Sequence, residues 1–227
     1  MKNVLVTDFS GMLEAEDFLA WMGEVVYKDW RDLEGTHCYC DEAAKKQILA
    51  GLPEPLPKLR WIDSGDYHYM SHLLSLKEKE PFHLVLLDHH PDDQEAAFGG
   101  VLSCGSWVRA MQEENPLLRD VLEIGPDGCP EAIPEGWLAA RRGERVYVSL
   151  DEDILCRCFA RTDWSQGTHT LEQVLKILGQ FLDGTVEVTA IDICGGLTIP
   201  KGATPEDLRV NRETNIELYK FITEHLK

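Results

Sequence analysis

Two apolar runs of this chain each end in metal-binding side chains placed at every second position. These side chains are Asp88, His90 and Asp92 after the first run, and Asp151 and Asp153 after the second. Because residues i and i+2 of an extended chain point to the same side, each set converges on one point beyond its strand. Four carboxylates held close together repel one another unless a cation neutralises them. The pattern therefore predicts a site for a pair of divalent metal ions.

The elements that must position these residues alternate along the chain. Apolar runs predict strands at 4–6, 59–62, 83–87, 120–124, 145–150 and 186–193. Helical spacing of apolar residues predicts helices at 13–26, 41–52, 70–79, 105–113, 170–181 and 204–226. Strands separated by helices are typical of a parallel sheet covered on both faces. We expect an α/β fold, a three-layer α/β/α arrangement with a central, mostly parallel sheet, formed by residues 1–227 as a single domain. Ligands of such sheets bind beyond the carboxyl ends of the strands, where both Asp-rich sets stand.

The composition limits the class of partner. Lys and Arg number 22 against 40 Asp and Glu, which gives a formal net charge of −18, and 44% of the residues are hydrophobic. A nucleic acid or an anionic membrane would repel such a chain, so we expect neither as a partner. The seven cysteines are odd in number and scattered, and no secretory segment is evident at the start of the sequence. Both features predict reduced thiols and a cytoplasmic location.

Four segments of the sequence are similar to segments of one enzyme family. Residues 88–92 resemble the Asp-x-His-x-Asp motif of the arginase/agmatinase (ureohydrolase) family, and residues 149–153 resemble its Ser-x-Asp-x-Asp motif. Residues 65–68, Gly-Asp-Tyr-His, resemble its Gly-Gly-Asp-His segment, and residues 190–193 look like the strand that follows the second motif. The order and spacing cover most of the chain, which resembles a divergent, short member of this family.

The resemblance implies an arginase-like fold and two Mn²⁺ ions. One ion would be bound by His68, Asp88, Asp92 and Asp151, and the other by Asp88, His90, Asp151 and Asp153. Asp88 and Asp151 would then bridge the two ions, and Asp92 could handle the proton of an activated water. Oxygen-rich sites with one imidazole per ion also suit Mn²⁺ on chemical grounds. Two adjacent metals can lower the pKa of a shared water and supply hydroxide near neutral pH.

The sequence departs from the family pattern at two places that concern metal and substrate. The family places Asp and His side by side, whereas Tyr67 intervenes here; strict register would make Tyr67 the ligand, and we favour His68. The family's late strand continues into a glutamate that holds the guanidinium group. Here the sequence has Gly195 and Gly196 in that region, so arginine is a poor candidate substrate.

His169 can be interpreted in two ways. The family's proton-relay histidine has no counterpart in residues 98–107, and His169, in a loop that resembles a segment beside the family's active site, could shuttle a proton instead. Alternatively, His169 begins a helix and bonds to nearby backbone.

Three functions are consistent with these residues. The first is a metal-dependent hydrolase that cleaves a carbon–nitrogen bond in a small amidino, ureido or amide compound. The second is a deacetylase-like amidohydrolase with one zinc ion, against which Asp92 and Asp153 argue because they complete a second site. The third is a catalytically silent member that keeps its metal and has a binding or regulatory role. We expect a small-molecule ligand, and homo-oligomers are possible because the family commonly forms them.

Overall fold

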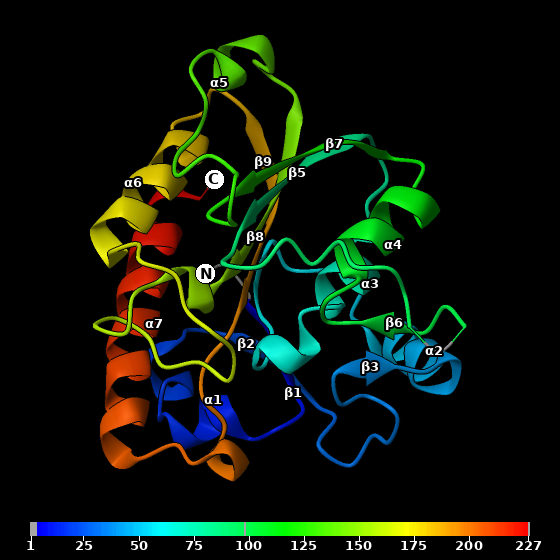
Figure 1. Cartoon of the computed structure of the whole chain (residues 1–227), viewed down its shortest axis with the longest axis vertical. Coiled ribbons are helices and arrows are strands. Elements are labelled where there is room, and N and C mark those ends of the chain that lie inside the picture. Colours follow the sequence, from blue (N-terminus) through cyan, green and yellow to red (C-terminus); the bar gives the residue numbers. More distant parts are fainter. Residues whose placement is uncertain (1–3, 98, 227) are drawn as a thin grey trace.

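Seven parallel strands form the centre of the computed structural model, which describes residues 4–97 and 99–226 (Figure 1). The strands are β1 (Val4–Asp8), β2 (Val25–Asp29), β4 (Leu59–Trp61), β5 (Phe82–Leu87), β7 (Leu118–Ile124), β8 (Arg145–Asp151) and β9 (Glu187–Cys194). Their order across the sheet is β2-β1-β4-β9-β8-β5-β7, and every pairing is parallel. The predicted parallel sheet is therefore confirmed.

The sheet separates two hydrophobic cores because its side chains alternate between the two faces. Along β5, Val85 and Leu87 contribute to one core, whereas Leu84 and Leu86 contribute to the other. Helices α6 (Leu171–Leu182) and α7 (Pro205–His225) cover the first face. Helices α2 (Glu42–Gly51), α3 (Met70–Ser75) and α4 (Trp107–Glu114) cover the second, on the right of Figure 1. This is the three-layer α/β/α arrangement that the sequence predicts.

Short elements complete the connections. A separate antiparallel ribbon pairs β3 (Tyr39–Cys40) with β6 (Leu102–Ser103). The short helices are α1 (Met12–Ala15) and α5 (Trp137–Ala140), and the 3₁₀ turns are η1 (Leu19–Trp21), η2 (Gly65–Tyr67), η3 (Glu152–Ile154) and η4 (Ile199–Lys201). The turn η3 follows strand β8 directly, η2 follows β4 after residues 62–64, and both turns shape the candidate site.

One predicted helix is wrong. The segment 13–26 was expected to be helical throughout, but it holds α1, η1 and the beginning of the edge strand β2. Asp17 adopts a positive φ of 56°, which ends the helix, and the β-branched Val25 pairs with Val4 of β1. Strand pairing at the sheet edge therefore outweighs the helical spacing of the apolar residues.

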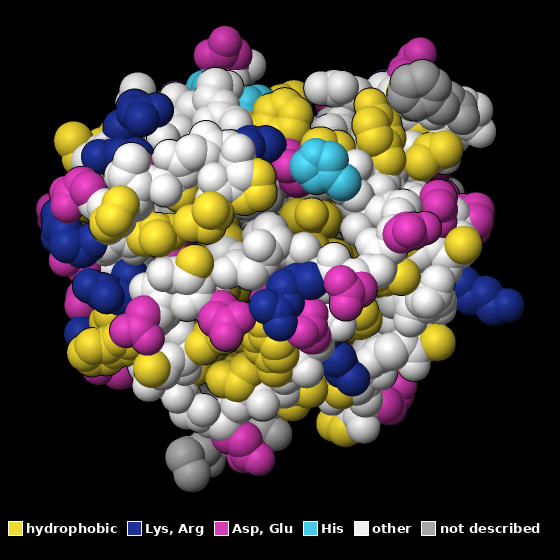
Figure 2. All heavy atoms as spheres, turned by 90° about the horizontal axis from the view of Figure 1, so that it is seen from below, with side chains coloured by type: hydrophobic (Ala, Val, Ile, Leu, Met, Phe, Trp, Pro, Cys, Tyr) yellow, Lys and Arg dark blue, Asp and Glu magenta, His cyan; other side chains and the backbone are white. Residues whose placement is uncertain are grey.

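The surface mixes side chains of different kinds. Figure 2 views the molecule from below, and Asp and Glu side chains there are interspersed with Lys, Arg and hydrophobic ones. Within the part of the chain that the structure describes, no helix is both long and apolar enough to span a bilayer.

Candidate metal centre

The two Asp-rich motifs meet at one edge of the sheet because their strands are neighbours. Strands β5 and β8 pair with Leu87 opposite Leu150, so Asp88 and Asp151 follow at adjacent strand ends. Beyond β8, Asp153 lies in η3, and its backbone N–H donates to Asp151 Oδ1 at 2.9 Å. The sequence order thus brings both motifs to a single point in the fold.

A histidine lies at the middle of the first group of carboxylates. His68 follows η2, and its Nδ1 lies 3.3 Å from Asp88 Oδ2, 3.1 Å from Asp92 Oδ2 and 3.3 Å from Asp151 Oδ2. Its other ring nitrogen, Nε2, lies 2.9 Å from Ser149 Oγ, which fixes the ring orientation. Nδ1 is therefore the atom that His68 directs at the carboxylates.

His90 directs its Nδ1 at a second group of carboxylates, Asp88 and Asp153. Its Nδ1 lies 2.8 Å from Asp153 Oδ2 and 3.7 Å from Asp88 Oδ1, while its Nε2 lies 2.9 Å from Ser165 Oγ. The backbone N–H of His90 donates to Asp88 Oδ1 at 2.7 Å, and that of His89 donates to Asp153 Oδ1 at 3.0 Å. Backbone and serine contacts thus hold both imidazoles with Nδ1 facing the acids. Such contacts to the distal ring nitrogen are typical of metal-binding histidines.

Burial and charge crowding shift the pKa values of this cluster. Burial raises the pKa of Asp153 to about 7, with a further contribution from Asp88, although His90 opposes it. Burial raises the pKa of Asp151 well above its usual value, and the charges of Asp153 and Asp88 add to the shift. Burial alone would lower the pKa of His68, but the nearby carboxylates of Asp88, Asp92 and Asp151 raise it well above the usual value. The cluster holds more acid than its two histidines can neutralise.

The donor set fits hard divalent cations. His68 Nδ1 and Asp88 Oδ2 are both buried and lack a hydrogen-bond partner, although they lie 3.3 Å apart. Buried polar atoms normally find a partner, so two facing orphan ligand atoms point to a missing cation. The ligand atoms of His68, Asp88 and Asp92 lie within 4.8 Å of one another, as do those of Asp88, His90 and Asp153. Carboxylate oxygens with one imidazole per ion suit Mn²⁺.

The structure brings together all six residues predicted as metal ligands. These are His68, Asp88, His90, Asp92, Asp151 and Asp153. Tyr67, the ligand that strict register would select, stacks on Phe9 instead, with ring centroids 4.5 Å apart. The one-residue insertion is accommodated by the turn η2, which places His68 inward.

His169 lies outside this cluster. Its Nε2 lies 3.0 Å from the backbone oxygen of Glu131 and 3.4 Å from Glu131 Oε2. It directly precedes Thr170, the N-cap of α6, and the described residues that line the pocket beside the carboxylates do not include it. This placement favours the second interpretation of His169, a helix-start residue bonded to backbone, over the proton shuttle.

A pocket of about 290 Å³ opens onto the carboxylates. Besides the cluster itself, the polar and aromatic side chains that line it are Cys38, Tyr39, Gln94, Ser103, Cys104 and Trp164. Its described lining contains no Lys or Arg. Trp164 Nε1 donates to Asp66 Oδ1 at 2.9 Å, and Lys201 Nζ lies 2.8 and 3.1 Å from the two oxygens of Asp66. Asp66, which neighbours the lining residue Gly65 but does not line the pocket itself, is therefore already paired with a cation.

Several supporting residues carry a weaker signal in the sequence. Trp107 Nε1 donates to Asp92 Oδ2 at 2.6 Å, so this buried tryptophan both fills the core and orients a ligand. Ser149 belongs to the second motif, which could have identified it as the partner of His68. Ser165 lies in the loop before His169, which resembles a segment beside the family's active site. Cys38, just before β3, and Tyr39, at its beginning, show no recognisable pattern, and only the fold places them here.

Gly195 shows why the family's guanidinium-binding carboxylate has no equivalent. Its φ is 122°, a conformation that L residues rarely adopt. A Cβ added there would lie 2.8 Å from Glu152 Cβ and 2.9 Å from Asp151 Oδ1. The backbone passes so close to the base of the cluster that no side chain fits at this position.

Comparisons of the sequence with known proteins do not name a family for this chain. No family model matches the chain. An uncharacterized protein of Thermotoga maritima is 27% identical over 200 residues, which cover 85% of this chain and 79% of that protein.

Solved structures of hydrolases share the fold over nearly the whole chain. The arginase of Medicago truncatula has a TM-score of 0.67 at 14% identity, with 99% of this chain and 87% of that one covered. A putative agmatinase from Clostridium difficile has a TM-score of 0.66 at 13% identity, with 99% and 98% covered. The formimidoylglutamase of Bacillus subtilis has a TM-score of 0.64 at 14% identity, with 100% and 88% covered. The chain therefore has the arginase-like ureohydrolase fold that its two Asp-rich motifs predict.

Proposed function

We propose that this protein is a binuclear-metal-dependent hydrolase that cleaves a carbon–nitrogen bond in a small amidino, ureido or amide compound. The observation that supports this most strongly is the pair of imidazoles directed at one carboxylate cluster. His68 Nδ1 faces three carboxylates at 3.1–3.3 Å, and His90 Nδ1 faces Asp153 at 2.8 Å. Buried acids in this number require divalent cations to be stable.

Each residue of the cluster has a proposed position relative to the two ions. His68, Asp88, Asp92 and Asp151 would hold one Mn²⁺, and Asp88, His90, Asp151 and Asp153 would hold the other. Asp88 would be shared because it lies 3.3 Å from His68 Nδ1 and 3.7 Å from His90 Nδ1. Asp151 would be shared because it lies 3.3 Å from His68 Nδ1 and accepts a hydrogen bond from the backbone N–H of Asp153. Loss of either shared carboxylate should therefore affect both ions.

A bound metal pair would lower the pKa of a water molecule and polarise the bond to be cleaved. Asp92 lies at the pocket surface and would accept the proton of the attacking water, held in place by Trp107 Nε1. Ser149 and Ser165 would keep the two imidazoles in the orientation that directs Nδ1 at the ions.

The pocket favours an uncharged reacting group over a guanidinium. No side chain fits at Gly195, and Asp66 is already paired with Lys201. A cationic guanidinium would lack a free carboxylate to bind, whereas a neutral amide or urea needs only hydrogen-bonding groups such as Gln94 and Ser103. Among the three compound classes, ureido and amide compounds are therefore the stronger candidates.

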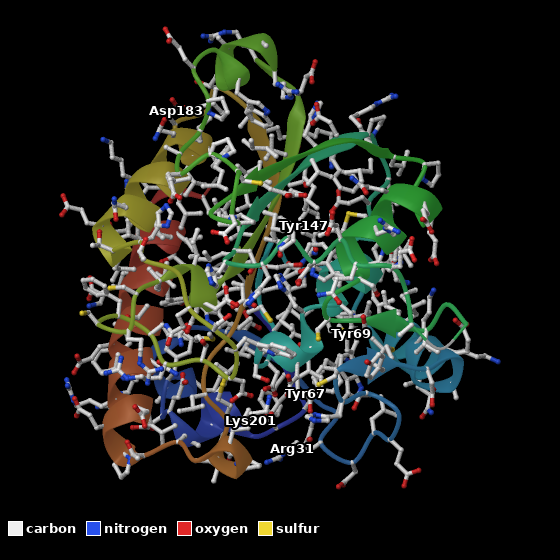
Figure 3. All side chains as sticks on the ribbon, viewed as in Figure 1. Arg31, Tyr67, Tyr69, Tyr147, Asp183 and Lys201 are labelled. Carbon is white, nitrogen blue, oxygen red and sulfur yellow. The ribbon has the colours of Figure 1, made fainter. Side chains whose placement is uncertain are left out.

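Turnover assays can test this proposal. Metal-free protein supplied with Mn²⁺ should hydrolyse at least one member of a panel of guanidino, ureido and N-acyl compounds, and the activity should disappear in Asp151→Ala. The matched control is Asp183→Ala, an exposed carboxylate at the end of α6 that lies far from Tyr67 and Lys201 in Figure 3. Equal activity in Asp151→Ala and the wild type would refute the proposed site.

A catalytically silent, metal-binding role is the second candidate, and the closed space at Gly195 favours it. This role predicts that two equivalents of Mn²⁺ bind while every compound of the panel remains unchanged. Detectable turnover of any compound that depends on Asp151 would exclude it.

A further inference from the structure

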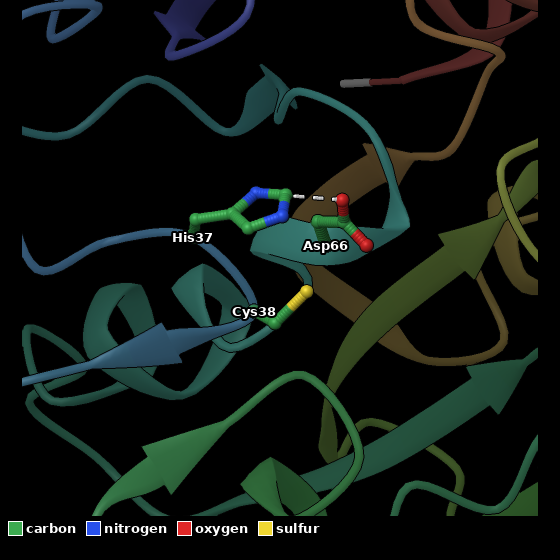
Figure 4. Close-up of side chains that lie close together, drawn as sticks. All are labelled: His37, Cys38 and Asp66. Carbon is green, nitrogen blue, oxygen red and sulfur yellow. Dashed lines mark ion pairs between the residues drawn. The ribbon is translucent and has the colours of Figure 1, made fainter. Parts of the chain in front are cut away.

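A second cluster of metal-binding side chains lies at the wall of the same pocket. His37 and Cys38 lie between β2 and β3, and both face Asp66 of η2 (Figure 4). One ligand atom from each of these three residues lies within 4.8 Å of the others, and His37 Nδ1 is 3.6 Å from Asp66 Oδ2. Unlike the carboxylate centre, this cluster contains sulfur.

A second thiol faces the first. In the antiparallel ribbon, Tyr39 pairs with Ser103 and Cys40 with Leu102, so the register places Cys104 opposite Cys38. The backbone N–H of Cys104 donates to the carbonyl of Cys38 at 3.0 Å, which holds the two residues side by side. Both cysteines line the pocket. The ribbon thus presents two thiols and an imidazole at one place.

The backbone at this place is held in an uncommon conformation. Cys38 has a φ of 56°, in the left-handed region that residues other than glycine rarely adopt. Such a conformation persists where the surroundings determine it, and it often marks functional sites. Here the turn directs His37 and Cys38, two successive residues, toward the same carboxylate.

The carboxylate of this cluster is already paired with Lys201, so sulfur and nitrogen are its available ligand atoms. Asp66 is nearly fully buried and faces both His37 and Cys38, while Lys201 and Trp164 hold it from the other side. Burial, followed by the charge of Asp66, raises the pKa of Cys38 to about 11. The free thiols therefore keep their protons until a cation replaces them.

We propose that His37, Cys38 and Cys104 bind a thiophilic divalent cation, Zn²⁺, with Asp66 facing it. Two bonds from sulfur and one from nitrogen to the ion would form, and the two thiol protons would pass to solvent. Thiolate and imidazole ligands select zinc, whereas the carboxylates of the candidate metal centre select harder ions. The two sites share no ligand, so this inference does not depend on the proposed function. An ion here would narrow the entrance to the carboxylates.

Cobalt spectroscopy tests the site because it separates sulfur from oxygen ligands. Reduced, metal-free full-length protein is titrated with Co²⁺ without oxygen, and the near-ultraviolet sulfur-to-cobalt charge-transfer band is recorded. We expect a band in the wild type that Zn²⁺ removes. The band should be lost in Cys38→Ser and in Cys104→Ser, and His37→Gln should weaken Co²⁺ binding by about tenfold or more.

Other variants identify the sulfur and separate this site from the carboxylate centre. Cys194 Sγ also lies within 4.8 Å of ligand atoms of His68 and Asp151, so Cys194→Ser is essential. A band that survives in Cys38→Ser and disappears in Cys194→Ser would overturn the proposal, as would the absence of any band. Cys158→Ser, at an exposed cysteine, should leave the band unchanged. Asp151→Ala should also keep the band while losing the other ions, so failure of one site is distinguishable from failure of the other.

Circular dichroism and the cobalt stoichiometry provide the folding control. Each cysteine variant should keep the wild-type spectrum and the ions bound by the carboxylates. A variant that has lost the charge-transfer band alone therefore supports the site, whereas one that retains it contradicts the assignment of its cysteine.

Discussion

Two groups of buried carboxylates lie on neighbouring strands of one sheet and differ in what surrounds them. Asp192, in the interior of β9, accepts a hydrogen bond from Tyr147 and lies 3.4 Å from Arg60 Nη1. Asp151, at the carboxyl end of β8, has His68 as its only basic neighbour among the described residues and adds to the charge of Asp88 and Asp153. Tyr147 lies in the middle of the molecule in Figure 3, well away from the labelled Tyr67 and Lys201.

The two groups differ in whether the charge of the carboxylate is balanced by other side chains of the protein. The Asp192 group is complete within the protein, because a guanidinium and a phenol satisfy the carboxylate. The Asp151 group is incomplete, because its acids outnumber its bases and two of its ligand atoms have no partner. Burial raises the pKa of both Asp192 and Asp151, so burial alone does not distinguish them. Asp192 and Asp151 differ in the number and kind of side chains that contact them.

The largest expected effect is the loss of metal from the incomplete group. Asp151→Ala should abolish metal uptake at both proposed positions, because this carboxylate would be shared by the two ions. Elemental analysis after dialysis against Mn²⁺ measures the stoichiometry. Asp192→Asn is the matched control on the next strand and should keep the wild-type stoichiometry. Two ions per chain in Asp151→Ala would contradict the assignment.

Substitutions in the Asp192 group should change the stability of the protein and leave its metal content unchanged. Arg60→Met leaves Asp192 buried without its cation, which should lower the free energy of unfolding by about 3–5 kcal/mol. Denaturant unfolding measures this change, and metal stoichiometry should stay constant. The double variant Arg60→Met/Asp192→Leu should recover much of the loss, because a well-packed apolar pair avoids the desolvation cost. A single variant as stable as the wild type would show that Asp192 does not depend on Arg60.

Metal removal should destabilise the wild type by a smaller amount. At a free Mn²⁺ concentration one hundred times the Kd, binding stabilises the folded state by about 2.7 kcal/mol. For a chain of this length, a chelator should then lower Tm by about 5–10 °C. In Asp151→Ala the chelator should have no effect. Identical melting curves of the wild type with and without chelator would argue against any cation in the cluster.

The sequence predicted the layers of the fold and the meeting of the two acidic motifs for the same physical reason. The buried strands β5 and β8 are nearly continuous apolar runs, so their ends are visible wherever charged residues begin. Parallel neighbours bring such ends together, which makes the meeting of Asp88 and Asp151 predictable from topology. The segment 13–26 was not predictable in this way, because the edge strand β2 depends on pairing with β1.

Residues that reach the site from loops could not be predicted from local patterns. Cys38 and Tyr39 line the pocket because the short ribbon of β3 and β6 holds them there, 60 or more positions away from their partners in sequence. His169 illustrates the opposite case, since its loop resembles a segment beside the family's active site but the histidine itself bonds to Glu131. A local sequence resemblance to a family segment predicts where a loop lies better than it predicts where the side chains of that loop point.

Glu16 extends the comparison to an acid that is neutralised by a proton. It is buried after α1, Asn215 Nδ2 donates to its Oε2 at 3.1 Å, and its Oε1 has no partner. Burial raises the pKa of Glu16 from 4.5 to about 8, although hydrogen bonds from Asn211 and Asn215 oppose the shift. Between these two values the folded protein keeps a proton that the unfolded chain releases.

The smallest expected effect is therefore a change in the pH dependence of stability. Because the folded state binds more protons, the stabilisation from Glu16 is complete below about pH 4.5 and is lost as the pH rises through about 8. Glu16→Gln carries no titrating proton, so its free energy of unfolding should fall less steeply over this window, by at most about 1.4 kcal/mol per pH unit. Urea unfolding with chelator at pH 5, 6, 7 and 8 measures the slope for both proteins. Glu24→Gln, at an exposed position, should reproduce the wild-type slope, and a Glu16→Gln slope equal to it would show that Glu16 is ionised in the folded protein.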